Sequence, residues 1–154
     1  MSTRRRLDLV YLVLAVAGIV VAGILTSFHF IPGAKAAYCT AAAGCGTVND
    51  SVYAKVLGVP VSLGGLVAYL VIAGLALASL RGWSRREWAP VAVFGLSLAG
   101  VLYSAYLTYV ELFVLHAVCP CCVASAVIMT VIFVVSLLDL FWLRAGPDPA
   151  RRRA

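Results

Sequence analysis

Four long apolar runs decide what this chain can fold into. They cover about residues 7–28, 63–80, 88–112 and 119–143, and Asp8 interrupts the first only at its edge. A helix rises about 1.5 Å per residue, so a run of about 18 residues or more can cross a hydrocarbon core about 30 Å thick. The chain is 64% hydrophobic and 12% charged, and a soluble domain of this size could not bury that much apolar surface. The sequence predicts an all-α membrane protein, a bundle of four transmembrane helices.

The basic residues predict the orientation of this bundle. Lys35 and Lys55 stand alone between the first two runs, whereas the arginines gather at both termini and between the second and third runs. Basic residues near membrane spans stay in the cytoplasm, so we expect a multi-pass protein of the cell (plasma) membrane with both termini cytoplasmic. The net charge of +6 is then explained by the basic residues that keep these segments in the cytoplasm. The basic clusters flank apolar spans and lack interleaved aromatic residues, so no nucleic-acid partner is expected.

The same pattern predicts the domain organisation. We expect a four-helix transmembrane domain over residues 1–143, with an outer loop at 29–62, and a cytoplasmic basic tail at 144–154. The first run also resembles a signal peptide with a cleavage site after Ala36. Its apolar region is longer than the usual length of about 7–15 residues, and Tyr38 before Cys39 suits a lipoprotein attachment site poorly. The first run is therefore expected to stay as a membrane helix.

The five cysteines all fall on the outer side in this topology. Cys39 and Cys45 lie in the outer loop, and Cys119, Cys121 and Cys122 lie where the chain enters the fourth run. Disulfides persist outside the cytoplasm, and an odd count leaves one thiol over. From residue type and position alone, Cys39 and Cys45 are either a structural disulfide or a redox-active pair.

Helix geometry separates the three clustered cysteines. Pro120 suits the first helical position, which makes Cys119 the N-cap and Cys122 the third helical residue. At about 100° per residue, Cys119 and Cys122 lie about 60° apart, whereas Cys121 points about 160° away from Cys119. Adjacent Cα atoms are about 3.8 Å apart, less than the usual disulfide span of about 4.4–6.8 Å. The expected working pair is Cys119 with Cys122, and Cys121 is a bystander.

A Cys-X-X-Cys motif at a helix start favours thiol–disulfide chemistry. The positive potential and free N–H groups of a helix N-terminus stabilise a thiolate and lower its pKa, which makes one thiol reactive. The alternative is half of a zinc site. However, His29, Glu111 and His116 stand at no standard metal spacing, and no histidine follows Cys122 as in a c-type haem motif. No metal is therefore expected.

The cysteines and the segment between them resemble a known family. The stretches CTAAAGCGTVNDSVYAKVLGVPVSLGGLVAYL and LHAVCPCCVAS are similar to the vitamin K epoxide reductase family in its prokaryotic form. The similarity runs from Leu7 to about Leu143. In that family the segment after the loop pair forms a short amphipathic half-helix at the outer surface. Residues 48–57 would be that element here, with Pro60 ending it.

The resemblance implies an integral-membrane thiol–disulfide oxidoreductase that supports disulfide formation in exported proteins. A separate extracytoplasmic thioredoxin-fold (DsbA-like) partner would reduce a Cys39–Cys45 disulfide, with Cys39 exchanging with the partner. Cys45 would pass the electrons to Cys119, and Cys122 would face a membrane quinone, menaquinone or ubiquinone. An apolar bundle suits a lipid-soluble cofactor.

Polar side chains at the outer ends of the last two runs are the candidates for the quinone site. Polar groups are costly inside a membrane, so each merits a functional hypothesis; the candidates are Tyr106, Glu111, His116 and Ser125. Interfacial tyrosines are also ordinary in an aromatic belt, which is the commoner explanation of Tyr103 and Tyr106. Glu111 is either a proton carrier or a solvated loop acid.

Departures from the family pattern narrow the chemistry. Animal members have a tyrosine where this chain has Ala126, so quinone reduction is expected rather than epoxide reduction. Cys121 stands where the family usually has another residue. Two alternatives are a DsbB-class quinone reductase, which places its Cys-X-X-Cys in the first outer loop, and a metal-ion binder or transporter with clustered thiols, which would leave the loop pair without a purpose.

Overall fold

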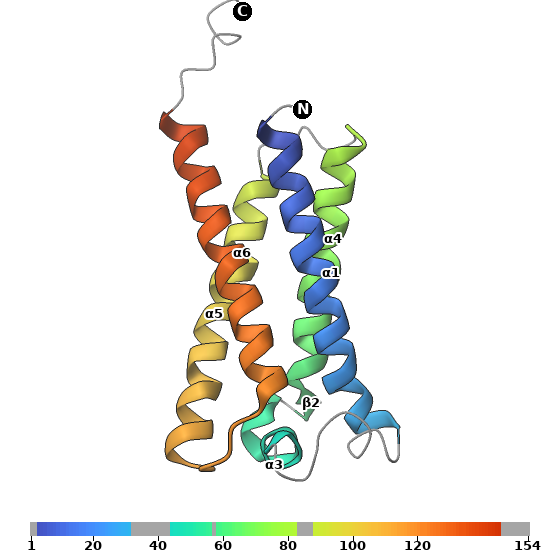
Figure 1. Ribbon diagram of the computed structural model, residues 1–154, viewed down its shortest axis with the longest axis vertical. Coiled ribbons are helices and arrows are strands. Elements are labelled where there is room, and N and C mark those ends of the chain that lie inside the picture. The colour runs from blue at the N-terminus through green and yellow to red at the C-terminus, as the bar shows by residue number, and fades with distance from the viewer. Residues whose placement is uncertain (1–2, 32–43, 57, 83–87, 146–154) are drawn as a thin grey trace, which may run out of the picture.

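Four long helices form a single bundle in the computed structural model, which describes residues 3–31, 44–56, 58–82 and 88–145. The helices are α1 (Thr3–Phe30), α4 (Val61–Leu80), α5 (Ala89–Phe113) and α6 (Pro120–Ala145), and they run side by side along the long axis (Figure 1). Each is long and apolar enough to cross a membrane. The predicted all-α membrane protein with four transmembrane helices is confirmed.

The helices begin where the sequence supplies start signals. α6 begins at Pro120, Pro60 is the N-cap of α4, and Pro90 lies in the first turn of α5. Proline suits these positions because its missing N–H would have no helical partner there. α1 and α4 extend into the two edges of the predicted outer loop at 29–62, and α6 continues into the predicted tail at 144–154.

The long helices pack in two pairs. α1 packs along α4 and α5 packs along α6, while α1 also contacts α6 and α4 makes few contacts with α5. Gly18 brings α1 close to α4, because a Cβ at this position would overlap the ring of Tyr69. Small residues let membrane helices approach closely in this way. The core of the bundle consists mainly of buried side chains of α1, α4 and α6, among them Ala15, Ile72 and Ile132.

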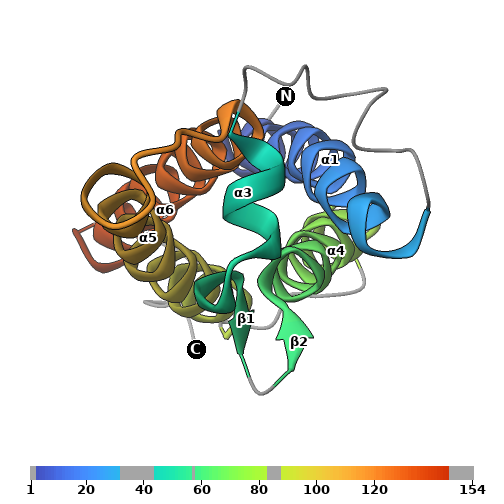
Figure 2. The same ribbon diagram turned by 90° about the horizontal axis from the view of Figure 1, so that it is seen from below.

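A short layer closes one end of the bundle. α3 (Cys45–Asp50) crosses this end between the α1–α4 pair and the α5–α6 pair, as Figure 2 shows from below. The 3-10 turn η1 (Val52–Ala54) follows, and then β1 (Lys55–Val56) pairs antiparallel with β2 (Val59–Pro60). We call this end of the bundle the cysteine end, because Cys45 and the start of α6 both lie there.

The half-helix differs from the one expected over residues 48–57. Its helical part begins earlier, at Cys45, and stops at Asp50, because Ser51 is extended with φ −64° and ψ 153°. The chain then turns once in η1 and becomes extended at Lys55. Gly58, at φ 84°, provides the left-handed conformation that the turn between the two strands requires.

Candidate functional site

Two cysteines from distant parts of the chain meet at the cysteine end. Cys45 is the first residue of α3, and Cys119 directly precedes α6. Both side chains are fully buried, and the Sγ atom of Cys119 lies 2.8 Å from the Sγ atom of Cys45. Because thiol–disulfide exchange requires one sulfur to attack another directly, this contact is the geometry that transfer between the two segments needs.

An apolar cluster surrounds these two sulfur atoms. Leu25 and Phe28 of α1 and Val48 of α3 are buried around Cys45 and Cys119. Such packing keeps water away from the sulfur atoms. It also fixes their positions, because close-packed interiors resist displacement.

Two polar contacts fasten the short layer to both helix pairs. The Asn49 side-chain amide of α3 donates a hydrogen bond to the Leu25 carbonyl of α1, at 3.2 Å. The Tyr103 hydroxyl of α5 donates to the Tyr53 carbonyl of η1, at 2.9 Å. The segment that carries Cys45 is therefore attached to the α1–α4 pair on one side and to the α5–α6 pair on the other.

Cys119 occupies the N-cap position of α6, as helix geometry predicted. The backbone N–H of Cys122 donates to the Sγ atom of Cys119 at 3.4 Å. This is the bond that a capping serine or threonine oxygen usually accepts from the third helical residue. The Cys-X-X-Cys pair therefore lies on one face of the helix start, and Cys122 is half-buried beside the fully buried Cys119.

Glu111 supports the turn between α5 and α6. The residue is only 2% exposed. Its carboxylate accepts a hydrogen bond from the backbone N–H of Cys119 at 3.2 Å, and its carbonyl accepts one from the Ala117 N–H at 3.0 Å. This carboxylate also accepts a hydrogen bond from the Cys122 thiol. Glu111 is thus a buried carboxylate beside both cysteines of the motif, and not a solvated loop acid.

The surroundings of Cys119 oppose its ionisation. The hydrogen bond with the Cys122 side chain and the burial of the thiol both raise the pKa of Cys119 above its ordinary value. For this residue the predicted lowering of the pKa is wrong. The N–H groups of a helix N-terminus favour a thiolate, but the hydrogen bond with the Cys122 side chain and the removal of the thiol from water together outweigh them.

The comparison with known proteins fits this geometry. The model of the vitamin K epoxide reductase family matches residues 9–137, which is most of the 154-residue chain. The chain belongs to the vitamin K epoxide reductase family. The match extends from α1 through most of α6 and includes Cys45, Cys119 and Cys122. Members of this family are oxidoreductases that act on thiols and quinones, and two buried sulfur atoms in contact suit such chemistry.

Two cysteines remain, Cys39 and Cys121. Cys39 lies outside the described residues, so its pairing with Cys45 stays a prediction. Cys121 is half-buried and packs against the apolar cluster around Cys45 and Cys119. Among the described residues, no three histidine, cysteine, aspartate or glutamate side chains come together where they could hold a metal ion.

The predicted quinone-site residues lie in different surroundings. Tyr106 is 46% exposed and packs edge-on against Tyr103, at 5.7 Å between ring centroids. His116 is also exposed and has a left-handed backbone, with φ 50°. The structure therefore brings Glu111 to the cysteines but places Tyr106 and His116 on the surface.

Ser125 is joined to a residue that the sequence did not single out. It lies one turn beyond Cys122 on α6, and the Tyr69 hydroxyl of α4 contacts both its carbonyl (3.0 Å) and its Oγ atom (3.1 Å). Tyr69 is fully buried. A tyrosine inside an apolar run was the available signal, because a buried phenol usually needs a hydrogen-bond partner.

Three buried polar atoms near the cysteine end lack a hydrogen-bond partner within the described part of the chain. They are Thr26 Oγ1 and His29 Nε2 in the last turns of α1, and Ser62 Oγ in the first turn of α4. Buried polar atoms are normally paired. These three can donate hydrogen bonds, so they suit a ligand with carbonyl acceptors, as a quinone has.

Proposed function

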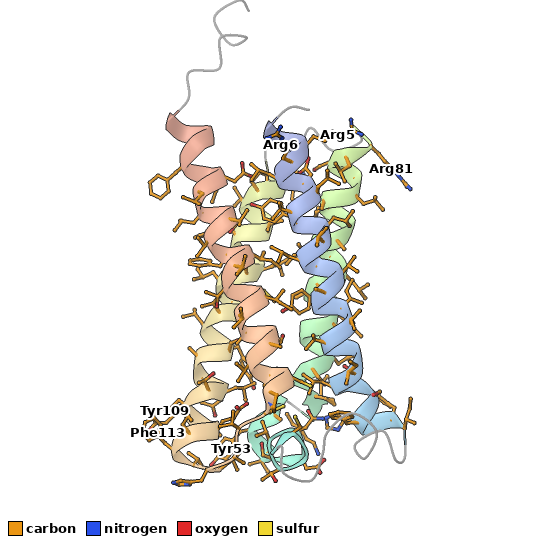
Figure 3. The ribbon with its side chains drawn as sticks, in the orientation of Figure 1. Arg5, Arg6, Tyr53, Arg81, Tyr109 and Phe113 are labelled. Carbon is orange, nitrogen blue, oxygen red and sulfur yellow. The ribbon has the colours of Figure 1, made fainter. Side chains whose placement is uncertain are left out.

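We propose that this protein passes electrons from a reduced thioredoxin-fold, DsbA-like partner through its cysteines to a membrane quinone, menaquinone or ubiquinone. The 2.8 Å contact between Cys45 and Cys119 is the observation that carries the proposal. In this proposal the cysteine end faces the outside of the plasma membrane. Arg5, Arg6 and Arg81, which lie at the opposite end (Figure 3), face the cytoplasm, as basic residues usually do.

The first half of the reaction reduces the loop pair. A thiolate of the partner attacks Cys39 in a Cys39–Cys45 disulfide, so a mixed disulfide forms and Cys45 leaves as a thiolate. The second thiolate of the partner then attacks its own sulfur in that mixed disulfide. The partner departs oxidised, and Cys39 and Cys45 are left as thiols that together carry two electrons.

The second half moves those electrons to the helix start. The Cys45 thiolate attacks Cys119, the Cys45–Cys119 bond forms, and the Cys119–Cys122 bond breaks with Cys122 as the leaving thiolate. Cys39 then attacks Cys45, which re-forms the loop disulfide and releases Cys119. Cys119 and Cys122 would then give up two electrons and two protons to a bound quinone, which would supply the electron acceptor and leave as a quinol, and their disulfide would re-form.

The structure supports this direction of attack. The Cys45 Sγ atom lies 2.8 Å from the Cys119 Sγ atom, so the attack of Cys45 is aimed at Cys119. A disulfide attacked at Cys119 therefore releases Cys122, whose side chain bonds to the Glu111 carboxylate. In the proposed site Glu111 takes the proton of the Cys122 thiol.

The quinone would be held beside the cysteines by groups that can donate to its carbonyl oxygens. Thr26, His29 and Ser62 have the buried polar atoms that suit this role. Apolar side chains of the cysteine cluster, such as Leu25 and Phe28, would exclude water from the site. Ser125, one turn beyond Cys122, stays a further candidate.

Turnover by cysteine variants tests the proposal. Membranes that contain the protein are supplied with a reduced DsbA-like protein and a quinone, and quinone reduction is followed by absorbance. Cys119→Ala and Cys122→Ala should abolish turnover, while Cys121→Ala should retain it as the matched control. If Cys121→Ala is inactive and Cys122→Ala is active, the assigned pair is wrong. If all three variants keep full activity, the redox function itself is refuted.

The order of transfer has its own test. In Cys122→Ser no Cys122 thiolate is present to attack the Cys119 sulfur of a Cys45–Cys119 disulfide. This variant should therefore accumulate the Cys45–Cys119 link after oxidation. Peptide mass spectrometry without reduction identifies the linked residues. A link between Cys39 and Cys119 in its place would reverse the proposed order of the two loop cysteines.

A further inference from the structure

A second polar cluster lies at the end of the bundle opposite the cysteines. A cavity of about 40 Å³ is lined there by residues of α1, α4, α5 and α6. Its polar lining consists of Asp8, Tyr11, Ser79 and Asp139, and the rest is apolar or small. The proposed electron transfer uses none of these residues, because α3 and the start of α6, which carry the cysteines, lie at the other end of the bundle (Figure 1).

Tyr11 shows that this cavity is more than a gap between acidic side chains. The residue is only 5% exposed, and its buried hydroxyl has no hydrogen-bond partner among the residues that the structure describes. A buried hydroxyl is normally paired, because leaving it unpaired costs free energy. Tyr11 nevertheless lines the cavity, and the carboxylates of Asp139 and Asp8 both act electrostatically on its phenol.

We propose that this cavity binds a hard divalent cation, Mg²⁺ or Ca²⁺, through the oxygen atoms of Asp8, Tyr11, Ser79 and Asp139. The polar groups of the described lining are two carboxylates and two hydroxyls. Mg²⁺ and Ca²⁺ prefer oxygen ligands, whereas softer metals prefer sulfur or imidazole, which this lining lacks. The two carboxylates also match the charge of a divalent ion.

The size of the cavity agrees with a partly hydrated ion. A single water molecule needs roughly 10–15 Å³ of such space, so about 40 Å³ holds an ion with one or two waters. Mg²⁺ in particular keeps several waters when proteins bind it through one or two carboxylates. The ion would join the carboxylates of α1 and α6 and the Ser79 hydroxyl of α4, and so would tie the two helix pairs together.

The charges around the cavity bear on this site. Arg5, Arg6 and Arg81 lie at the same end (Figure 3) and are exposed. Their positive charges lower the local affinity for a cation, but exposed charges are screened by salt, whereas a partly buried carboxylate pair is screened much less. Binding of the ion should therefore persist at moderate ionic strength.

Thermal unfolding of the full-length protein tests the site. The protein is purified in detergent, stripped with EDTA, and unfolded at increasing MgCl₂ or CaCl₂ with the ionic strength held constant by NaCl. An ion that binds only the folded state raises the unfolding midpoint with its concentration. We expect a saturable rise for the unaltered protein and for Asp50→Asn, a control that removes an exposed carboxylate at the cysteine end.

Two variants separate the site from general charge effects. Asp139→Asn should weaken the apparent affinity at least tenfold. Tyr11→Phe keeps both carboxylates and removes only an unpaired hydroxyl, so it should unfold at the same or a higher temperature without divalent ions, yet respond less to them. Because Tyr11→Phe preserves the packing, it keeps the test decisive if Asp139→Asn does not fold.

Three results would overturn the proposal. One is the absence of a saturable shift with either ion. The second is an equal shift in Tyr11→Phe, Asp139→Asn and the unaltered protein, which would place the ion elsewhere. The third is stabilisation by mild acid alone with no response to divalent ions, which would mean that Asp8 and Asp139 share a proton.

Discussion

Gly44 offers the most direct test of the contact between the two cysteine segments. A Cβ atom at this position would lie 2.7 Å from the Cβ of Ala117 and 3.2 Å from its Cα and carbonyl carbon. Carbon atoms pack at about 3.5–4.0 Å. The substitution Gly44→Ala must therefore push α3 away from the chain before α6 by about 1 Å. The backbone of Gly44, at φ −59° and ψ 15°, suits alanine, so the effect arises from this contact alone.

This displacement moves the Cys45 Sγ atom away from the Cys119 Sγ atom, because Cys45 follows Gly44 directly. The distance from Cys45 Sγ to Cys119 Sγ is 2.8 Å, and a misplacement of about 1 Å can slow a reaction about 100-fold. We expect Gly44→Ala to slow formation of the Cys45–Cys119 link by about this factor. The link is measured in a Cys122→Ser background, by quenching oxidation at successive times and quantifying the joined peptides. Quinone reduction by the variant with Cys122 intact should fall in parallel.

Gly46 provides the matched control. It lies one residue beyond Cys45 in the same short helix, and a Cβ there would meet nothing within 4 Å. Gly46→Ala should therefore form the link at the original rate, and alanine even favours the helix by up to about 1 kcal/mol. If Gly44→Ala reacts as fast as the unaltered protein, or if both glycine variants slow equally, the argument from close contact is refuted.

Three further outcomes are expected. Gly18→Ala should lower the free energy of unfolding in detergent by about 1–3 kcal/mol, because its Cβ overlaps the buried Tyr69 ring, while Gly23→Ala, which has open space, should change it little. The raised pKa of Cys119 means that the folded state holds this proton more tightly than the unfolded chain. The stability of the reduced protein should therefore decline above about pH 8.5, and Cys119→Ser should reduce that decline. If Cys119→Ser loses stability with pH as steeply as the unaltered protein, Cys119 is not the group responsible. Glu111→Gln keeps a hydrogen-bond acceptor but loses the proton acceptor, so quinone reduction should fall at least about tenfold, while unfolding temperature and the Cys119–Cys122 disulfide stay intact.

The architecture could be predicted from the sequence because the membrane leaves few choices. Backbone groups in hydrocarbon must be paired within the chain, so a long apolar run becomes a helix. Local rules also placed the Cys-X-X-Cys motif correctly at a helix start, because α6 begins at Pro120 and Cys119 caps it. The half-helix was placed less well, because its end depends on the backbone of Ser51, for which no strong local signal exists.

The interior of the site could not be predicted from local rules. Cys45 and Cys119 are separated by 74 positions, and only the family resemblance suggested their meeting. The burial of Glu111 depends on how the chain after α5 folds back so that the Cys119 N–H reaches its carboxylate. The sequence predicted a lowered pKa for one thiol of the motif from the helix N-terminus, which is a local feature. The pKa of Cys119 is raised instead by the hydrogen bond with the Cys122 side chain and by burial against α3 and α1, which depends on how distant segments pack.

The packing of the long helices in two pairs has a consequence for how the molecule could be assembled. The part of the sequence up to Gly82, which forms the α1–α4 pair and the short layer, contains Cys39 and Cys45, and the part from Trp88 onward contains Cys119 and Cys122. The chain could therefore be severed between Gly82 and Trp88 and expressed as two polypeptides, each with one dithiol. Neither fragment could complete the proposed transfer alone, and activity recovered on co-expression would report how well the fragments reassociate.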